Sequence, residues 1–384
     1  MLRVNMKDFP TARRVTYLNS ASISLMPQPV IQSMTAFQQK IAAGGTIDFD
    51  EKAETRAVEN ARDEAASLLN AHRDEIAILS SATEGMCSFA YCLDLKPNAN
   101  VVSTDAEFPS VVYPWIRLRS EKNIEVRLAK NRDGVVDKQE VEKLVDDRTA
   151  VISISHVEYG TGQRHDLRWL SELAHAHGAL LLVDATQSAG LMSIDVHRDG
   201  VDALAAGGYK GMLGPFGAAV LYLKQELVES LKPSMVGWRS TPVPYDLDAT
   251  RLTFADSARK FEYSTMNYAS AIGLGESLQY LSKLGHGNIA SHVLSLTKGF
   301  MDMIADNNRL SGTITLTPLE EDSRASIAAF RFKTKDQSAI AAKLVKRNVI
   351  VSHRFNGVRF SFHAYNTEQD LVKANEALGD VLTH

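Results

Sequence analysis

The sequence predicts an α/β protein: a large unit with a mostly parallel sheet covered by helices, followed by a small α+β unit. Short apolar strands alternate with amphipathic helices over 76–231, which is typical of a parallel sheet with helices on both faces. Beyond this region helices and strands mix without strict alternation. Because no repeat or flexible linker separates the units, we expect domains at 15–266 and 267–384 that pack together, with 1–14 on the second.

The elements of the large unit follow from apolar periodicity. Apolar residues at helical spacing predict a first helix over 50–70. Short apolar runs predict strands near 76–79, 100–104, 124–128, 150–156, 179–183, 202–206 and 217–222. Amphipathic runs between them predict helices near 84–92, 110–120, 137–146, 166–177 and 225–231.

The second unit opens with a long predicted helix over 267–283, which the glycine-containing run 284–287 interrupts. The same periodicity rules then predict a smaller set of mixed elements. These are helices over 288–306, 336–347 and 367–380, and strands near 312–316, 326–333, 349–352 and 358–362.

Composition excludes several classes of protein. The chain has 384 residues, of which 45% are hydrophobic and 23% charged, and a net charge of −4, so it lacks the basic balance of a nucleic-acid binder. No run is long and apolar enough for a membrane helix, and the start lacks a secretory apolar core. Cys87 and Cys92 are spaced too far apart for a C-x-x-C redox or zinc motif, so we interpret both as structural thiols. We expect a cytoplasmic enzyme without a metal site.

Two side chains at the ends of predicted strands indicate a specific chemistry. Lys210 follows an apolar strand in the glycine-rich run 205–217. Partial desolvation there would lower its pKa and free the amine to form an imine with an aldehyde. Asp184 ends the apolar run 180–184, where a carboxylate could hold a pyridinium N–H and keep the ring protonated. Ligands bind at the carboxyl ends of such strands, so the pair predicts a pyridoxal phosphate (PLP) site.

Two further segments fit the same cofactor. Gln187 follows Asp184 at a spacing that lets its amide reach the phenolic oxygen. The run 80–85 follows a strand and opens a helix, whose free N–H groups and dipole favour a phosphate. Each feature alone also has a simpler interpretation, namely a surface lysine, an aspartate in a turn, or a helix N-cap. Their combination favours the cofactor.

The order of these motifs resembles the class V aminotransferase family of fold-type I PLP-dependent enzymes. The chain carries the Ser/Ala/Thr loop at 80–85, Glu-Phe-Pro-Ser at 107–110, Asp-x-x-Gln at 184–187 and Lys-Gly-x-x-Gly-Pro at 210–215. The resemblance extends from about Tyr17 to the C-terminus and is more specific for fold and cofactor than for reaction. The family includes cysteine desulfurases, kynureninase, isopenicillin N epimerase and serine–glyoxylate transaminases.

The resemblance implies roles for residues around the cofactor. Lys210 would form the Schiff base, Asp184 would pair with the pyridinium, and Gln187 would contact the phenolate. Ala82 and Thr83 would bind the phosphate.

Two more positions are implied at the edges of the cofactor. Phe108 stands where the family places the ring that stacks on PLP, a histidine in desulfurases and a phenylalanine in kynureninase; a core aromatic is the alternative. The run Ser-Thr-Met-Asn at 264–267 resembles the family's Gly-Thr-Pro-Asn segment, whose threonine reaches the phosphate of the other subunit. Thr265 would then make the active site a property of a homodimer.

The run 358–367 resembles the family's Arg-x-Ser-x-x-x-Tyr-Asn-Thr signature. Arg359 would hold the α-carboxylate of the substrate with two parallel hydrogen bonds, and a surface arginine is the alternative. Arg354 is a candidate second anion contact. The implied partner is therefore a small-molecule amino acid, with no nucleic acid or membrane involved.

Two departures from the family patterns narrow the reaction. Desulfurases carry a nucleophilic cysteine on the loop before the carboxylate-binding arginine, whereas 351–358 contains none. The run 156–163 places Tyr159 where many relatives have asparagine, and it resembles the Val-Gln-Tyr-x-Thr-Gly-Gln run of kynureninase. Tyr209 before the lysine and Trp238 after a glycine match kynureninase in the same way, which implies that all three aromatic residues contact the cofactor.

These features predict a PLP-dependent enzyme that acts on an α-amino acid. A substrate amine would displace Lys210 from its aldimine, the freed lysine would remove the Cα proton, and the protonated ring would delocalise the carbanion. We expect a kynureninase-like lyase or hydrolase that cleaves at the β or γ carbon. The alternatives are a class V aminotransferase, an amino-acid epimerase and, more remotely, a non-catalytic PLP-binding protein.

Overall fold

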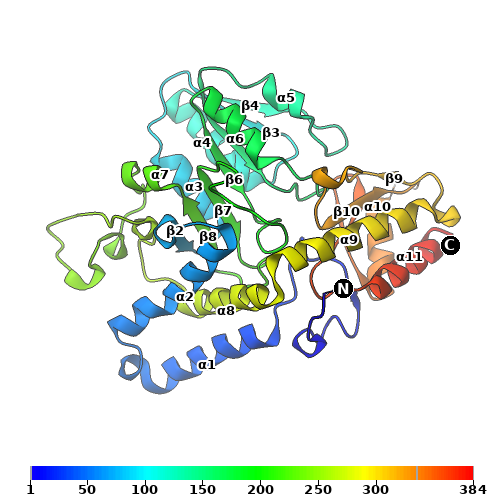
Figure 1. The fold of residues 1–384 in the computed structure, drawn as a ribbon, viewed down its shortest axis with the longest axis horizontal. Helices are drawn as coiled ribbons and strands as arrows, with labels where there is room; N and C mark the ends of the chain where they lie inside the picture. Colours follow the sequence, from blue (N-terminus) through cyan, green and yellow to red (C-terminus); the bar gives the residue numbers. More distant parts are fainter. Residues whose placement is uncertain (1, 334–335, 384) are drawn as a thin grey trace.

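A seven-stranded sheet and a four-stranded sheet organise the chain in the computed structural model, which describes residues 2–333 and 336–383. Helix α8 (Tyr268–Leu284) lies along the larger sheet, and α9 (His286–Ala305) continues from it toward the smaller sheet (Figure 1). The domain division at 15–266 and 267–384 remains a proposal, and residues 1, 334, 335 and 384 within it lie outside the described residues.

The larger sheet is almost entirely parallel. Its order is β2-β8-β7-β6-β5-β3-β4, and only β8 runs antiparallel to its neighbours. Each strand matches a predicted one to within about two residues. The bounds are β2 (Ile76–Leu79), β3 (Asn100–Thr104), β4 (Glu125–Ala129), β5 (Thr149–Ser155), β6 (Leu180–Asp184), β7 (Ala203–Gly207) and β8 (Ala219–Leu223).

Both faces of this sheet are buried. Neighbouring residues such as Leu181 and Leu182 point to opposite faces and belong to two separate hydrophobic cores. One core contains residues of α3 (Ala82–Cys92), α4 (Pro109–Lys122) and α7 (Gln225–Ser230). The other contains residues of α2 (Glu51–Leu69), α5 (Lys138–Glu142), α6 (Leu167–Ala176), α8 and α9. Helix α1 (Gln28–Gly44), which the sequence analysis did not predict, packs against α8.

The four-stranded sheet is antiparallel, in the order β12-β13-β10-β9. A cluster of phenylalanine rings that includes Phe300, Phe330 and Phe360 forms the core between it and the nearby helices. The strands of this sheet are β9 (Ile314–Thr315), β10 (Ile327–Arg331), β12 (Ser352–Arg354) and β13 (Gly357–Ser361). The nearby helices include α10 (Gln337–Lys346) and α11 (Glu368–Thr383).

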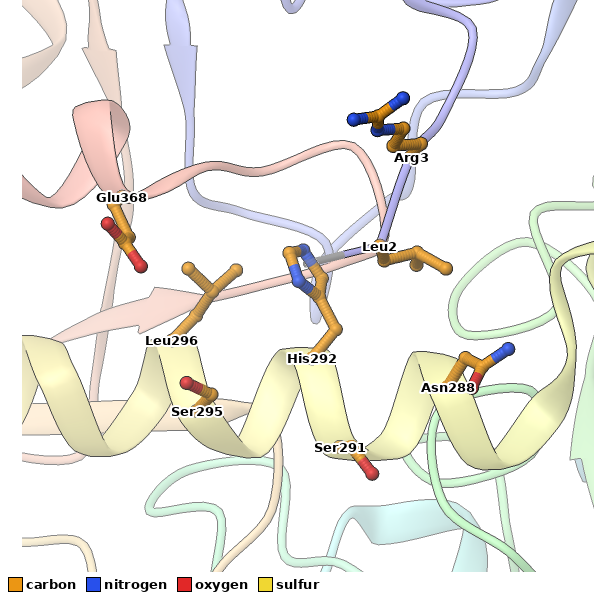
Figure 2. A pocket seen from close by; sticks show the side chains of 8 residues that line it. All are labelled: Leu2, Arg3, Asn288, Ser291, His292, Ser295, Leu296 and Glu368. Atoms are coloured by element: carbon orange, nitrogen blue, oxygen red, sulfur yellow. The ribbon is translucent and has the colours of Figure 1, made fainter.

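The N-terminal segment crosses the molecule. Strand β1 (Thr16–Tyr17) pairs in parallel with β11 (Val349–Ile350), so the strand predicted at 349–352 is divided between two sheets. The ring of Phe9 lies 5.0 Å from that of Tyr365. Residues Leu2 and Arg3 line a cavity of about 600 Å³ with α9 and Glu368, and no residue predicted to bind the cofactor is among those that line it (Figure 2).

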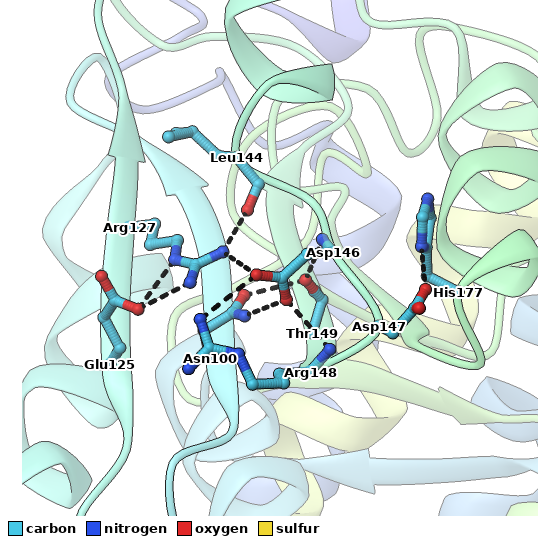
Figure 3. Close-up of polar contacts among 9 residues, drawn as sticks. All are labelled: Asn100, Glu125, Arg127, Leu144, Asp146, Asp147, Arg148, Thr149 and His177. Carbon is cyan, nitrogen blue, oxygen red and sulfur yellow. Dashed lines mark hydrogen bonds and ion pairs between the residues drawn. The ribbon is translucent and has the colours of Figure 1, made fainter.

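A polar network ties together the amino-terminal ends of β3 and β5, opposite the edge predicted to bind ligand. The Asp146 carboxylate accepts hydrogen bonds from Arg127 Nη1 at 2.9 Å and Asn100 Nδ2 at 2.8 Å (Figure 3). Asn100 in turn accepts from Thr149 Oγ1 at 2.9 Å. The pKa of Asp146 is lowered, and the hydrogen bond from Arg127 is the main cause.

No helix formed by the described residues combines the length and the apolar character needed to cross a membrane.

Candidate active site

The carboxyl ends of β6 and β7 bring Asp184 and Lys210 into one region. Asp184 is the last residue of β6, and Lys210 follows the end of β7; the two side chains are 6% and 9% exposed. Burial lowers the pKa of Lys210 to about 8, with Asp184 opposing this effect and Arg359 adding to it. Burial raises the pKa of Asp184, although the backbone N–H of Thr186 donates to its Oδ1 at 2.8 Å.

The Lys210 amine faces aromatic rings. Its Nζ lies 5.6 Å from the ring centre of Phe108 and 5.5 Å from that of Tyr209. Among the described residues no acceptor lies within hydrogen-bonding distance of Nζ. An amine with a lowered pKa and no competing hydrogen bond can attack an aldehyde near neutral pH.

Close backbone contacts hold the loop that carries Lys210. A Cβ atom added to Gly211 would lie 2.3 Å from the carbonyl oxygen of Ala189, so only glycine fits there. The ring of His363 accepts at Nδ1 from the Ala364 N–H at 2.7 Å, so its Nε2 carries the proton and donates to the Gly211 carbonyl at 3.0 Å. Burial lowers the pKa of His363 to about 4 and keeps the ring neutral. His363 was missed in the sequence, although it lies within the predicted arginine signature.

The start of α3 leaves backbone donors free for an anion. Ser81 caps the helix, and its carbonyl accepts from the Gly85 N–H at 3.2 Å. The N–H groups of Ala82 and Thr83 have no acceptor among the described residues. The Thr83 hydroxyl lies 2.8 Å from that of Ser110, the second residue of α4. Two free N–H groups beside two hydroxyls form a donor set that suits a phosphate.

Three other predicted residues lie in different surroundings. Gln187 donates one amide hydrogen to the Ala21 carbonyl at 3.0 Å, which leaves its second hydrogen for another acceptor. Thr265 lines a cavity of about 160 Å³ with Ser80 at the start of the predicted phosphate loop. Trp238 contacts Tyr245, with ring centres 5.2 Å apart, and no interaction within the described part of this single chain connects it to Lys210.

Arg359 on β13 is a buried cation without a carboxylate partner among the described residues. Its Nη2 donates to Ser22 Oγ at 2.6 Å, Nη1 to the Tyr159 carbonyl at 2.5 Å and Nε to Ser352 Oγ at 3.1 Å. Burial lowers its pKa to about 9, and Arg354 adds to this effect. No described carboxylate forms an ion pair with it, so a bound carboxylate would relieve the cost of burying this charge. No sequence pattern pointed to Ser22, which contacts Arg359 only through the fold.

Arg354 is exposed at the end of β12, and its Nη1 donates to the carbonyl of His353 at 2.7 Å. The segment 351–358 forms the β12–β13 hairpin, with Phe355 at its tip. The two cysteines lie on α3, where burial raises the pKa of both thiols.

A pair of buried carboxyl groups lies next to this region. Both oxygens of Glu107 accept from Ser155, from the backbone N–H at 2.6 Å and from the hydroxyl at 2.5 Å. Glu158 is fully buried and lies 3.3 Å from His165 Nε2. Burial and then the charge of Glu158 raise the pKa of Glu107 well above its usual range, while burial, with Asp184 adding a smaller effect, raises that of Glu158 to about 8. Because burial lowers the pKa of His165 to about 4, this neighbouring ring is neutral and does not balance the pair, which keeps a proton at neutral pH.

Comparison with known proteins decides the family. The profile of the aminotransferase class-V family matches residues 16–373. The chain belongs to this family. Its relatives include a probable cysteine desulfurase of Methanothermobacter thermautotrophicus, 30% identical over 394 positions that cover 98% of this chain and 96% of that protein. The uncharacterized aminotransferase YcbU of Bacillus subtilis is also 30% identical, over 98% of this chain and 97% of YcbU.

A solved structure agrees in fold along the whole length. The apo structure of the cysteine desulfurase from Thermococcus onnurineus NA1 superposes with a TM-score of 0.89 at 25% identity and covers 100% of both chains. The predictions of a class V, fold-type I, PLP-dependent enzyme are therefore confirmed.

The residues present fit PLP. The free N–H groups of Ala82 and Thr83 suit its phosphate, and the buried Asp184 carboxylate suits a protonated ring nitrogen. The Lys210 amine, which forms no hydrogen bond with a described residue, suits its aldehyde carbon. The individual roles of these residues in this class-V enzyme stay predictions.

Proposed function

We propose that this class-V enzyme cleaves a bond at the β or γ carbon of an α-amino acid, as a lyase or hydrolase, without a protein-bound persulfide. The observation that carries the proposal is the β12–β13 hairpin. In the desulfurase pattern this segment supplies the nucleophilic cysteine, whereas here it presents Phe355. The proposal therefore departs from the activity named for several relatives.

Binding of the substrate would begin at Arg359. Its guanidinium would hold the α-carboxylate, because it is buried, unpaired and fixed by Ser22, Ser352 and the Tyr159 carbonyl. This contact orients the bonds at Cα but is the same for every amino acid, so Arg359 does not decide which bond breaks. An Arg359→Ala variant should raise KM for all substrates.

Proton transfer would then fall to Lys210. PLP, when bound, supplies the electron sink that makes the Cα proton acidic. The pKa of Lys210, lowered to about 8 by burial, lets a neutral Nζ accept that proton near physiological pH. Asp184 would remain ionised against the ring nitrogen and keep the sink protonated.

The rest of the proposed site follows the same placement. Gln187 would contact the phenolate, Phe108 would stack on the ring, and Ala82 with Thr83 would hold the phosphate. The remaining proposed cofactor contacts are Tyr159, Tyr209, Trp238 and the partner subunit's Thr265. A homodimer that acts in the cytoplasm completes the proposal.

Turnover of an amino-acid panel tests the reaction type. Purified enzyme would be assayed for ammonia, sulfide and keto acid, and for alanine from L-cysteine. We expect carbon–heteroatom or carbon–carbon cleavage products, and any sulfur release should be unchanged in a Cys87→Ser, Cys92→Ser double variant. A radiolabelled persulfide on either cysteine would overturn the proposal.

Transamination is the second candidate, because YcbU, as similar as any desulfurase relative described above, is named an aminotransferase. It would appear as turnover that requires an added 2-oxo acid and transfers the amino group to it without release of ammonia.

A further inference from the structure

Phe355 occupies a backbone conformation that disfavours it. The β12–β13 hairpin pairs Arg354 with Gly357, so Phe355 and Asn356 form a two-residue turn. The φ angle of Phe355 is +47°, a left-handed value that glycine or asparagine adopts far more readily than a bulky residue. The strain costs stability, and strained residues of this kind collect at functional sites.

The chain makes room for this ring. A Cβ atom at Gly160 would lie 1.9 and 2.1 Å from two ring carbons of Phe355, so any side chain there would displace the ring. The ring is still 38% exposed and therefore retains a free surface. Gly160 follows Tyr159 directly, which places Phe355 against the segment that fixes Arg359.

Three aromatic side chains form a row between the hairpin tip and Lys210. The ring centres of Phe355 and Tyr159 lie 5.5 Å apart, and those of Tyr159 and Phe108 are also 5.5 Å apart. Phe108 in turn lies 5.6 Å from Lys210 Nζ. The Tyr159 carbonyl accepts from Arg359, so the row runs beside the unpaired cation. We call Phe108, Tyr159 and Phe355 the aromatic row.

We propose that Phe355 and Tyr159 of the aromatic row determine specificity, and that they select α-amino acids with a large apolar side chain, aromatic or branched, beyond Cβ. The inference rests on the proposed function, in which Arg359 holds the substrate carboxylate. A side chain attached to a carboxylate at Arg359 would lie near ring faces, where apolar and aromatic groups gain contact energy. The hairpin tip would thus supply an apolar contact in place of a nucleophile.

An anionic side chain is the competing possibility, because Arg354 adjoins Phe355. The guanidinium of Arg354 is exposed and donates to the neighbouring His353 carbonyl, whereas the rings are fixed by Gly160 and by one another. Surface charges gain little from a partner in water. The structure therefore favours an apolar group over a second carboxylate.

Calorimetric titration of the PLP-loaded enzyme with unreactive carboxylates tests the proposal without turnover. The probes are 3-phenylpropionate, butyrate and glutarate, which lack an amine. We expect 3-phenylpropionate to bind about tenfold more tightly than either of the others, since ring contacts of this kind are worth roughly that factor. Phe355→Ala should reduce the preference to about twofold or less.

Two further variants separate this effect from misfolding. Phe355→Asn removes the ring but accepts the left-handed turn, so it should lose the preference without a lower melting temperature. Tyr91→Ala removes an aromatic side chain of similar exposure, 40%, from the far end of α3 and should leave all three affinities unchanged.

Equal binding of the three carboxylates, or a preference that survives in Phe355→Asn, would refute the inference. Tightest binding by glutarate, abolished in Arg354→Gln, would assign selection to the cation instead. These measurements need no reaction. The affinities can therefore support or refute the role of Phe355 even if the proposed cleavage activity is not found.

Discussion

Replacement of Glu158 by glutamine should make the enzyme less sensitive to alkaline pH. The buried pair of Glu107 and Glu158 retains a proton that the unfolded chain releases, because the pKa of Glu158 is raised from 4.5 to about 8 in the fold. A raised folded-state pKa gives stability that is complete below the unfolded value and is lost as the pH rises through the folded value. The loss therefore falls between about pH 4.5 and pH 8. Glutamine keeps the shape and a hydrogen-bond donor but does not titrate.

The expected loss of stability corresponds to the release of one proton when the folded protein unfolds. Stability changes by about 1.4 kcal/mol per pH unit for each proton, so the wild type should lose about 2 to 3 kcal/mol relative to Glu158→Gln between roughly pH 6 and pH 8. An unfolding entropy of about 2 cal/mol/K per residue over 384 residues converts this to a relative shift of about 3 °C in melting temperature.

Differential scanning fluorimetry of the PLP-loaded enzymes across this range measures the shift. Contributions from groups that do not contact Glu158 are common to both proteins and cancel in the difference. The exposed Glu142→Gln variant serves as a control and should follow the wild type. If the melting temperatures of the wild type and Glu158→Gln run parallel within about 1 °C, the carboxyl pair does not store a proton in this window.

Three more outcomes test the proposed PLP contacts. Lys210→Ala should lose the visible absorbance of the purified enzyme, and borohydride should no longer attach the cofactor; labelling of another lysine in the wild type would contradict this assignment. Asp184→Asn should fold but lose several orders of magnitude in turnover, and a value within about threefold of the wild type would exclude the pyridinium role. Mixing inactive Thr265→Ala and Lys210→Ala proteins should restore activity, because a hybrid dimer would hold one complete site if Thr265 reaches across; a fully active monomer in sedimentation would rule out the shared site.

The strands of the large sheet were predictable because both of their faces are buried. Runs such as Leu180–Asp184 are continuous apolar segments bounded by polar residues, which gives a strong local signal. Helix α1 was missed although Val30, Met34, Phe37 and Ile41 form an apolar stripe at helical spacing; Val30 is its single fully buried residue. The division of 349–352 depends on pairing with Thr16, far away in the sequence, which local periodicity cannot reveal.

Some features of the candidate site were likewise predictable from the sequence, and others were not. Lys210 and Asp184 were visible because each lies at or just after the end of an apolar strand, and the parallel topology then brings strand ends together. The partners of Arg359 were not visible, because Ser22 and the Tyr159 carbonyl reach it only through tertiary contacts. The charge state of Glu158 depends on burial and on a neighbouring carboxyl group, and neither can be known from the residue type alone.

The hydrogen bond from His363, which follows the end of β13, to the Gly211 carbonyl ties this strand to the loop that carries Lys210. The same stretch of chain carries Arg359 and, four residues later, the imidazole bound to the peptide next to Lys210. A displacement of this strand would therefore reach the lysine loop through one hydrogen bond. The connection between the carboxylate anchor and the proton acceptor therefore consists of the short segment 359–363 and the hydrogen bond from His363 to the Gly211 carbonyl.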